Sequence, residues 1–69
     1  MQSLTINGVE REFQNGIPKT LSDLLNALNL NRATVVAEIN GRIIKRDNFA
    51  DTALTSGQAI ELVRLVGGG

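Results

Sequence analysis

The sequence lacks the side chains that most often carry out catalysis or hold a metal ion. It has 69 residues and contains no cysteine, histidine, tryptophan or tyrosine. Without cysteine there is no disulfide, no cysteine-based zinc site and no thiol nucleophile. Without histidine the chain lacks the commonest general base and the commonest metal ligand. We therefore expect a protein that is not an enzyme and that binds no metal and no cofactor of its own.

The sequence also lacks an excess of charge and a long apolar run. Seven Lys and Arg residues balance seven Asp and Glu residues, which argues against nonspecific nucleic-acid binding because such binding needs clustered positive charge. The longest apolar run is three residues, Val35–Ala37, whereas a membrane-spanning helix needs about 20. The segment Met1–Ile6 has no basic stretch followed by an apolar one, so we expect no targeting signal and a cytoplasmic location.

Two Asn-Gly pairs, Asn7-Gly8 and Asn40-Gly41, each lie between stretches of alternating apolar and polar residues. Such a pair favours a two-residue hairpin turn, because both central residues of a type I′ turn have positive φ. Arg11 falls on the apolar side of its strand, which indicates an edge strand whose long side chain can reach water. The strands of the two predicted hairpins are residues 3–6, 9–13, 35–39 and 42–45.

Residues 20–28 have the pattern of an amphipathic helix. Thr20 is the predicted N-cap, and Asp23 is the capping acid near the positive end of the helix dipole. Pro18 helps to separate this helix from the preceding strand, because proline cannot donate a backbone hydrogen bond. Four leucines at positions i, i+3, i+4 and i+7 form a single apolar stripe: Leu21, Leu24, Leu25 and Leu28.

The last third of the chain is predicted to contain an irregular segment and one buried strand. Residues 46–57 show no periodicity, with Phe49 and Leu54 as expected core residues and Ser56-Gly57 as a turn. Arg46 is expected to form a surface ion pair with Asp47 or Glu38 rather than to contact a partner. Residues 59–66 are apolar at most positions, which is typical of a central strand.

These elements predict an α+β fold, with one helix packed on one face of a mixed sheet of four to five strands. With the last strand placed centrally beside the first, this is the β-grasp arrangement of ubiquitin-like proteins. A chain of this length has room for one hydrophobic core. We therefore expect a single β-grasp domain over residues 1–66, followed by a flexible C-terminal glycine tail at residues 67–69.

The sheet face opposite the helix is a candidate docking surface. By strand parity, Ile60 and Leu62 face the core, whereas neighbouring apolar residues face outward. Contiguous exposed apolar residues often mark interaction sites, although an ordinary covered or edge face would give the same pattern. The predicted docking residues are Val36, Val63, Leu65 and Val66.

The chain ends in three consecutive glycines, Gly67, Gly68 and Gly69. A segment without side chains can enter a narrow channel in another protein, where a Cβ atom would clash. When extended, Val66–Gly69 spans at most about 13–14 Å, which is enough to place the terminal carboxylate inside a partner's active site. A frayed terminus or a linker would give the same pattern. If the chain has a reactive group, this carboxylate is the best placed.

Several segments together resemble the ThiS family of sulfur carrier proteins of thiamin biosynthesis: TLSDLLNAL, VVAEINGRIIKR with the following DNF, SGQAIELV and the closing VGGG. The resemblance implies that a ThiF-like adenylating enzyme uses ATP and Mg to convert the carboxylate of Gly69 into an acyl-adenylate. Sulfur from a cysteine desulfurase then replaces AMP and leaves a thiocarboxylate. The thiocarboxylate passes its sulfur to thiazole synthase, a ThiG-like enzyme. Gly67 and Gly68 would thread the partner's active site.

Two residues depart from the commonest pattern of that family. Gln58 stands where an acidic residue often follows the turn glycine, and Lys45 stands where proline often precedes the arginine. Neither residue belongs to the tail, so neither changes the implied chemistry.

Other functions use the same fold. The small subunit of molybdopterin synthase (MoaD-like) also ends in Gly-Gly but is typically longer. A ubiquitin-like protein modifier would transfer its activated terminus to lysine. An interaction or RNA-binding module would make no use of the tail, and the neutral charge of this chain counts against RNA.

Overall fold

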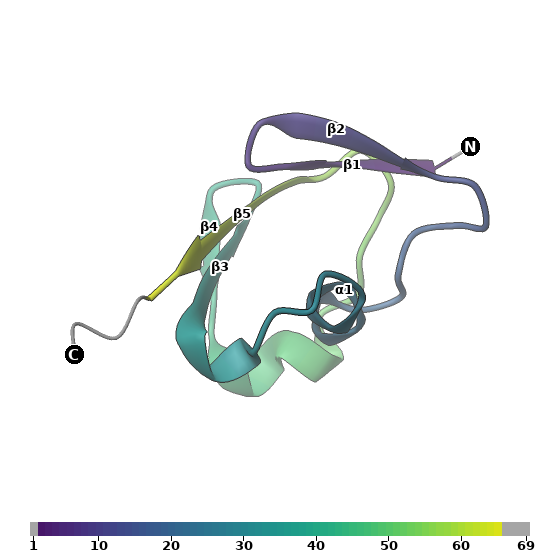
Figure 1. Ribbon diagram of the computed structural model, residues 1–69. Coiled ribbons are helices and arrows are strands. Elements are labelled where there is room, and N and C mark those ends of the chain that lie inside the picture. The colour runs from purple at the N-terminus through teal and green to yellow at the C-terminus, as the bar shows by residue number, and fades with distance from the viewer. Residues whose placement is uncertain (1, 66–69) are drawn as a thin grey trace.

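The computed structural model describes residues 2–65 as one five-stranded mixed sheet that curves around a single α-helix (Figure 1). The strand order is β2-β1-β5-β3-β4, in which β1 and β5 are parallel and the other neighbours are antiparallel. The last strand therefore lies centrally beside the first, so the predicted β-grasp arrangement is confirmed, with five strands. The elements in chain order are β1 (Gln2–Ile6), β2 (Val9–Phe13), α1 (Leu21–Ala27), η1 (Arg32–Thr34), β3 (Val35–Ile39), β4 (Arg42–Ile44), η2 (Arg46–Asp51) and β5 (Ala59–Arg64).

Both Asn-Gly pairs form the predicted hairpin turns. Asn7 and Gly8 have φ values of 50° and 83°, and Asn40 and Gly41 have φ values of 50° and 84°. These positive values at both central residues are those of a type I′ turn. The two hairpins form the two ends of the sheet, with β2 and β4 as the edge strands. The edge position predicted from Arg11 is thus confirmed.

The helix packs its leucine stripe against the sheet. The Thr20 hydroxyl oxygen accepts a hydrogen bond from the backbone N–H of Asp23 at 3.1 Å, which confirms the predicted N-cap. Leu21, Leu24 and Leu25 are buried, and Leu28 is partly buried against the same core. The other buried apolar residues come from the sheet and from the segment after β4: Leu4, Ile6, Val35, Ala37, Ile39, Phe49, Leu54, Ile60 and Leu62.

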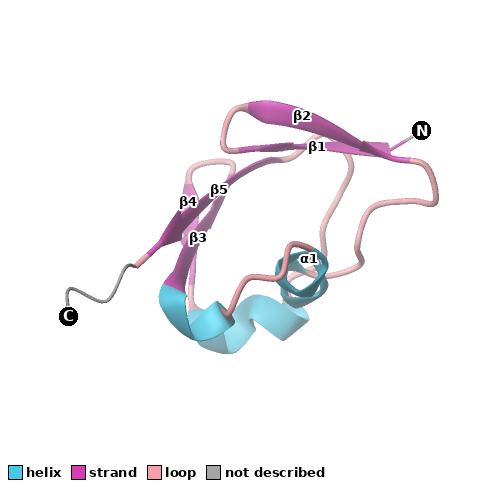
Figure 2. Ribbon diagram, in the orientation of Figure 1, coloured by secondary structure: helices cyan, strands magenta, loops and turns pink. Residues whose placement is uncertain are grey.

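The segment after β4 is more regular than predicted. Residues Arg46–Asp51 form a short 3-10 helix, η2, which lies beside α1 (Figure 2). The expectation of an irregular segment was wrong here, because a 3-10 helix with a single buried residue, Phe49, has no apolar periodicity to detect. The expected burial of Phe49 and Leu54 is confirmed. Arg46 makes a different contact from the expected ion pair, since its Nε donates to the backbone oxygen of Arg32 at 2.9 Å.

The central strand is shorter than predicted. β5 ends at Arg64, so Leu65 lies outside the strand. The backbone N–H of Leu65 nevertheless donates to the carbonyl oxygen of Thr34 at 2.7 Å, which extends the contact with the chain entering β3. Val66, also placed in the predicted strand, lies outside the described residues.

The asparagines of both turns also hold the central strand. The Asn7 side chain donates to the carbonyl oxygen of Leu62 at 3.1 Å and accepts from the N–H of Leu62 at 2.7 Å. The Asn40 side chain accepts from the N–H of Ala59 at 2.9 Å, and its backbone N–H donates to the carbonyl oxygen of Ala59. The register of β1 with β5 includes Thr5↔Ala59 and Ile6↔Ile60. The Asn7 side chain therefore continues this pairing beyond the end of β1.

We expect the substitution Asn7→Gly to lower the free energy of unfolding by about 1–3 kcal/mol. Glycine accepts the positive φ of residue 7, so the turn is retained while two partly buried hydrogen bonds are lost. Urea denaturation measures the change. Asn29→Gly is the matched control, because Asn29 also has positive φ (61°) but lies just after α1 rather than against β5. Equal losses in the two variants would contradict a stabilising role for the Leu62 contact.

Candidate docking face and carrier tail

Two kinds of feature are absent from the described part of the chain. Among residues 2–65, no helix is both long enough and apolar enough to cross a membrane. The same residues bring together no group of three or more His, Cys, Asp or Glu side chains that could hold a metal ion.

The sheet face opposite α1 carries an exposed apolar patch. Val36 and Val63 lie directly opposite one another in the β3–β5 ladder. Val63 is 53% exposed and Leu65 is 52% exposed, whereas Val36 is half-buried. The outward orientation predicted for these three residues is confirmed. The core orientation of Ile60 and Leu62, which are both buried, is confirmed too.

The structure adds one residue that the sequence analysis did not assign to this face. Ile43 on β4 pairs with Glu38 on β3, which places Ile43 on the same side of the sheet as Val36. Its side chain is 71% exposed. A three-residue strand shows too little alternation to reveal which face each residue occupies. We call Val36, Ile43, Val63 and Leu65 the outer-face patch.

Two acidic residues lie beside this patch. Glu38 and Glu61 are directly opposite one another in the β3–β5 ladder and share the outer face with Val36 and Val63. Like charges that face each other across two strands disfavour the pairing. A partner surface that is apolar and carries a basic group would cover the patch and offset this repulsion.

The predicted tail residues follow directly from this face. Gly67, Gly68 and Gly69, together with Val66, lie outside the described residues, so the roles assigned to them remain predictions. The last described residue, Leu65, belongs to the outer-face patch and is hydrogen-bonded to Thr34. In Figure 1 the described part of the chain ends just after β5. The tail therefore begins beside the candidate docking residues.

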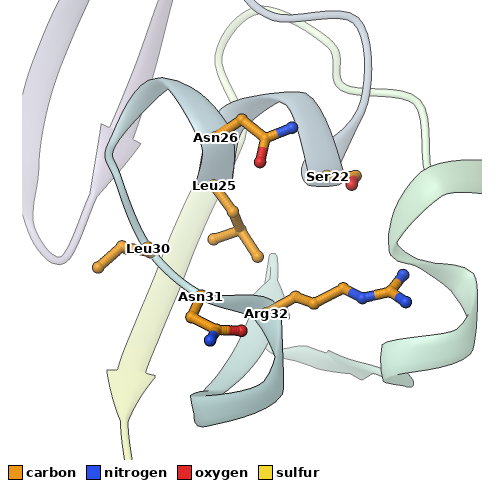
Figure 3. Close-up of a pocket in the computed structure, with 6 residues that line it drawn as sticks. All are labelled: Ser22, Leu25, Asn26, Leu30, Asn31 and Arg32. Carbon is orange, nitrogen blue, oxygen red and sulfur yellow. The ribbon is translucent and has the colours of Figure 1, made fainter.

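A separate cleft of about 420 Å³ lies between α1 and the segment that leads into β3 (Figure 3). Leu25 is buried beneath it, and the side chains around it are mostly polar. The Asn31 side chain is engaged in local structure, since its oxygen accepts a hydrogen bond from the N–H of Ala33 at the start of η1. Arg32 is the one charged residue among the six lining residues, which include no carboxylate. This cleft therefore presents no pair of groups suited to general acid–base chemistry.

Comparison with known proteins identifies the family. The sequence matches the ThiS family over residues 2–69. The chain belongs to the ThiS family. Its fold is similar to the crystal structure of the thiamine biosynthesis protein ThiS from Geobacter metallireducens, with a TM-score of 0.81 and 32% sequence identity, over 97% of this chain and 99% of that one. A solution structure of a thiamine biosynthesis protein from the same organism gives a TM-score of 0.80 at 32% identity, over 97% of this chain and 87% of that one.

Two sequence relatives differ greatly in their own length. A thiazole synthase from Paramagnetospirillum magneticum is 35% identical over 66 residues, which are 96% of this chain but only 20% of that protein. An uncharacterized protein, ycf40, from Trieres chinensis is 38% identical over 64 residues, which are 93% of this chain and 85% of that protein. The present chain thus spans a fifth of the thiazole synthase, and the resemblance to ThiS found in the sequence is confirmed.

Proposed function

We propose that this chain is a sulfur carrier of thiamin biosynthesis, in which Gly69 is adenylated and then converted to a thiocarboxylate that donates sulfur for thiazole formation. The chain is a protein co-substrate in this scheme, and the catalytic groups, ATP and Mg belong to a ThiF-like adenylating enzyme. The observation that carries the proposal is the family match, which runs to residue 69 and so includes the glycine tail.

The chemistry needs only the terminal carboxylate from this chain. A carboxylate oxygen attacks the α-phosphorus of ATP, and pyrophosphate leaves. A persulfide sulfur supplied by a cysteine desulfurase then attacks the acyl carbon, and AMP leaves with the electron pair of the broken C–O bond. A thiol cleaves the resulting acyl disulfide, which gives the thiocarboxylate and a new disulfide.

The thiazole product is favoured by the relative from Paramagnetospirillum magneticum. A protein named thiazole synthase contains a segment 35% identical to nearly all of this chain. A ThiG-like thiazole synthase is therefore the proposed acceptor of the sulfur. The outer-face patch, which lies next to the root of the tail, is the proposed docking surface for the adenylating enzyme.

Intact-mass spectrometry tests the proposal. We expect the full chain, expressed with a ThiF-like enzyme and a cysteine desulfurase, to gain the mass that corresponds to one oxygen replaced by sulfur. The thiocarboxylated protein should then support thiazole formation with a ThiG-like enzyme and should not support molybdopterin formation. An unchanged mass with active partner enzymes would overturn the carrier proposal, and conjugates to lysine would indicate a protein modifier.

A further inference from the structure

A second surface lies on the opposite side of the sheet from the outer-face patch. It is a groove of about 480 Å³ between the β1–β2 hairpin, the end of β5 and the chain that follows α1. Its apolar lining includes Val9, Leu28, Leu30 and Leu62, and two arginines, Arg11 and Arg64, also line it. We call this surface the hairpin groove.

The groove is open because the helix is short. α1 ends at Ala27, so the core-side face of the sheet is not covered by helix near the Asn7-Gly8 turn. Val9 pairs with the buried Ile6 and therefore lies on the core side of the sheet, yet Val9 is 63% exposed. An apolar side chain on the inner face thus remains available to another molecule.

The strand beside the groove can accept a further strand. β2 is an edge strand whose neighbour in the sheet is β1. In a two-residue hairpin the residues that flank the turn, here Ile6 and Val9, form a hydrogen-bonded pair, and such pairs alternate along the ladder. The backbone N–H and C=O groups of Glu10 and Glu12 are therefore directed toward the open edge. Unpaired groups of this kind are a template for an added strand.

The charges around the groove determine which charged side chains an added strand would have on each of its faces. Arg11 on β2 can form a charge-assisted hydrogen bond with a carboxylate on the groove side of the added strand, and Arg64 adds a second positive charge to the lining of the groove. Glu10 and Glu12 occupy the other face of β2, where a carboxylate would be repelled and a lysine attracted. The two faces of the edge therefore favour opposite charges.

We propose that the hairpin groove binds an extended segment of a partner protein, which adds to the open edge of β2. Its groove-side residues are apolar or acidic, to match the apolar lining and the two arginines, and its alternate residues are polar or basic. An open β-edge does not match a helix, and the alternation of charge does not match a lipid surface. The proposal is independent of the carrier function, since it uses the other side of the sheet and none of the tail.

A peptide titration followed by NMR tests this proposal on the full-length protein. The probe is the acetylated and amidated peptide KVTVTDK, whose two valines and aspartate share one face in an extended conformation. We expect saturable shift changes at the amides of Glu10 and Glu12 and at the methyl groups of Val9, Leu28 and Leu30. The methyl groups of Ile43 and Val63 should not change. No saturable change, or change confined to the outer-face patch, would overturn the proposal.

Two pairs of variants sharpen the test. We expect Arg11→Glu to weaken peptide binding about tenfold, because a charge-assisted contact is replaced by repulsion. Lys19→Glu, which changes the net charge equally at an exposed residue outside the groove, should leave binding unchanged. Val9→Asp should weaken binding, whereas Ile43→Asp, at an exposed apolar residue of the other face, should not. Equal losses from Arg11→Glu and Lys19→Glu would show that the effect does not depend on the groove and would overturn the proposal.

Failure of the hairpin-groove proposal can be distinguished from failure of the carrier proposal. Arg11→Glu and Val9→Asp should leave the oxygen-to-sulfur exchange at the terminus unchanged. Loss of that exchange in both variants, with the fold intact, would contradict the assignment of separate partners to the two sides of the sheet.

Discussion

Deletion of Gly69 is expected to lower ATP–pyrophosphate exchange by the adenylating enzyme at least about 100-fold, with no change in thermal stability. Removing one residue withdraws the terminal carboxylate by about 3.3–3.6 Å. A misplacement of about 1 Å at a reacting centre already costs about 100-fold in rate. Folding should be unaffected, because the buried apolar residues found among residues 2–65 lie between Leu4 and Leu62.

A second variant separates the effect of tail length from the effect of side-chain size in the tail. Gly69→Ala keeps the length of the tail and adds one methyl group, so it tests whether the partner's channel excludes a Cβ atom. We expect exchange to fall in this variant too, and circular dichroism to show the same fold in both. Normal exchange by the Gly69 deletion would refute the assignment of the terminal carboxylate as the reacting group.

The second large effect is expected at the outer-face patch. Val63→Asp should weaken binding of the adenylating enzyme about tenfold or more, because it places a charge in the apolar centre of the proposed interface. The melting temperature should change little, since Val63 is 53% exposed on the side of the sheet away from the core. Isothermal titration calorimetry measures the affinity.

Val9→Asp is the matched control for this prediction. It makes the same substitution at an exposed valine of another strand, 63% exposed, on the other side of the sheet. Binding of the adenylating enzyme should be unchanged in that variant. A loss of stability in Val63→Asp as large as its loss of affinity would show that Val63 belongs to the folded core rather than to an interface.

Local patterns were sufficient to predict most of the fold. The Asn-Gly pairs specify their turns because few other residues accept positive φ at both positions. The leucine stripe specifies the buried side of α1, and strand parity predicted the outward orientation of Val63 and Leu65. Each of these features depends on residues close together in the sequence, so each could be read from the sequence alone.

The features that were not predicted depend on residues far apart in the sequence. The hydrogen bonds between Asn7 and Leu62 join positions separated by 55 residues. The turn pattern that explains Asn7 gives no signal for this second contact. The hairpin groove likewise combines Val9 and Arg11 with Leu28 and Arg64, so it exists only once the sheet order is known.

The central place of β5 has a mechanical consequence for the proposed carrier role, in which the terminus would be drawn into another enzyme. When force pulls the end of an edge strand away from its single neighbour, the hydrogen bonds between the two strands break one after another. β5 is bonded to β1 on one side and β3 on the other, and asparagines from both hairpin turns hold it as well. Force applied at its end is therefore shared among many bonds at once. We therefore expect the folded body to resist unfolding when its C-terminal end is pulled.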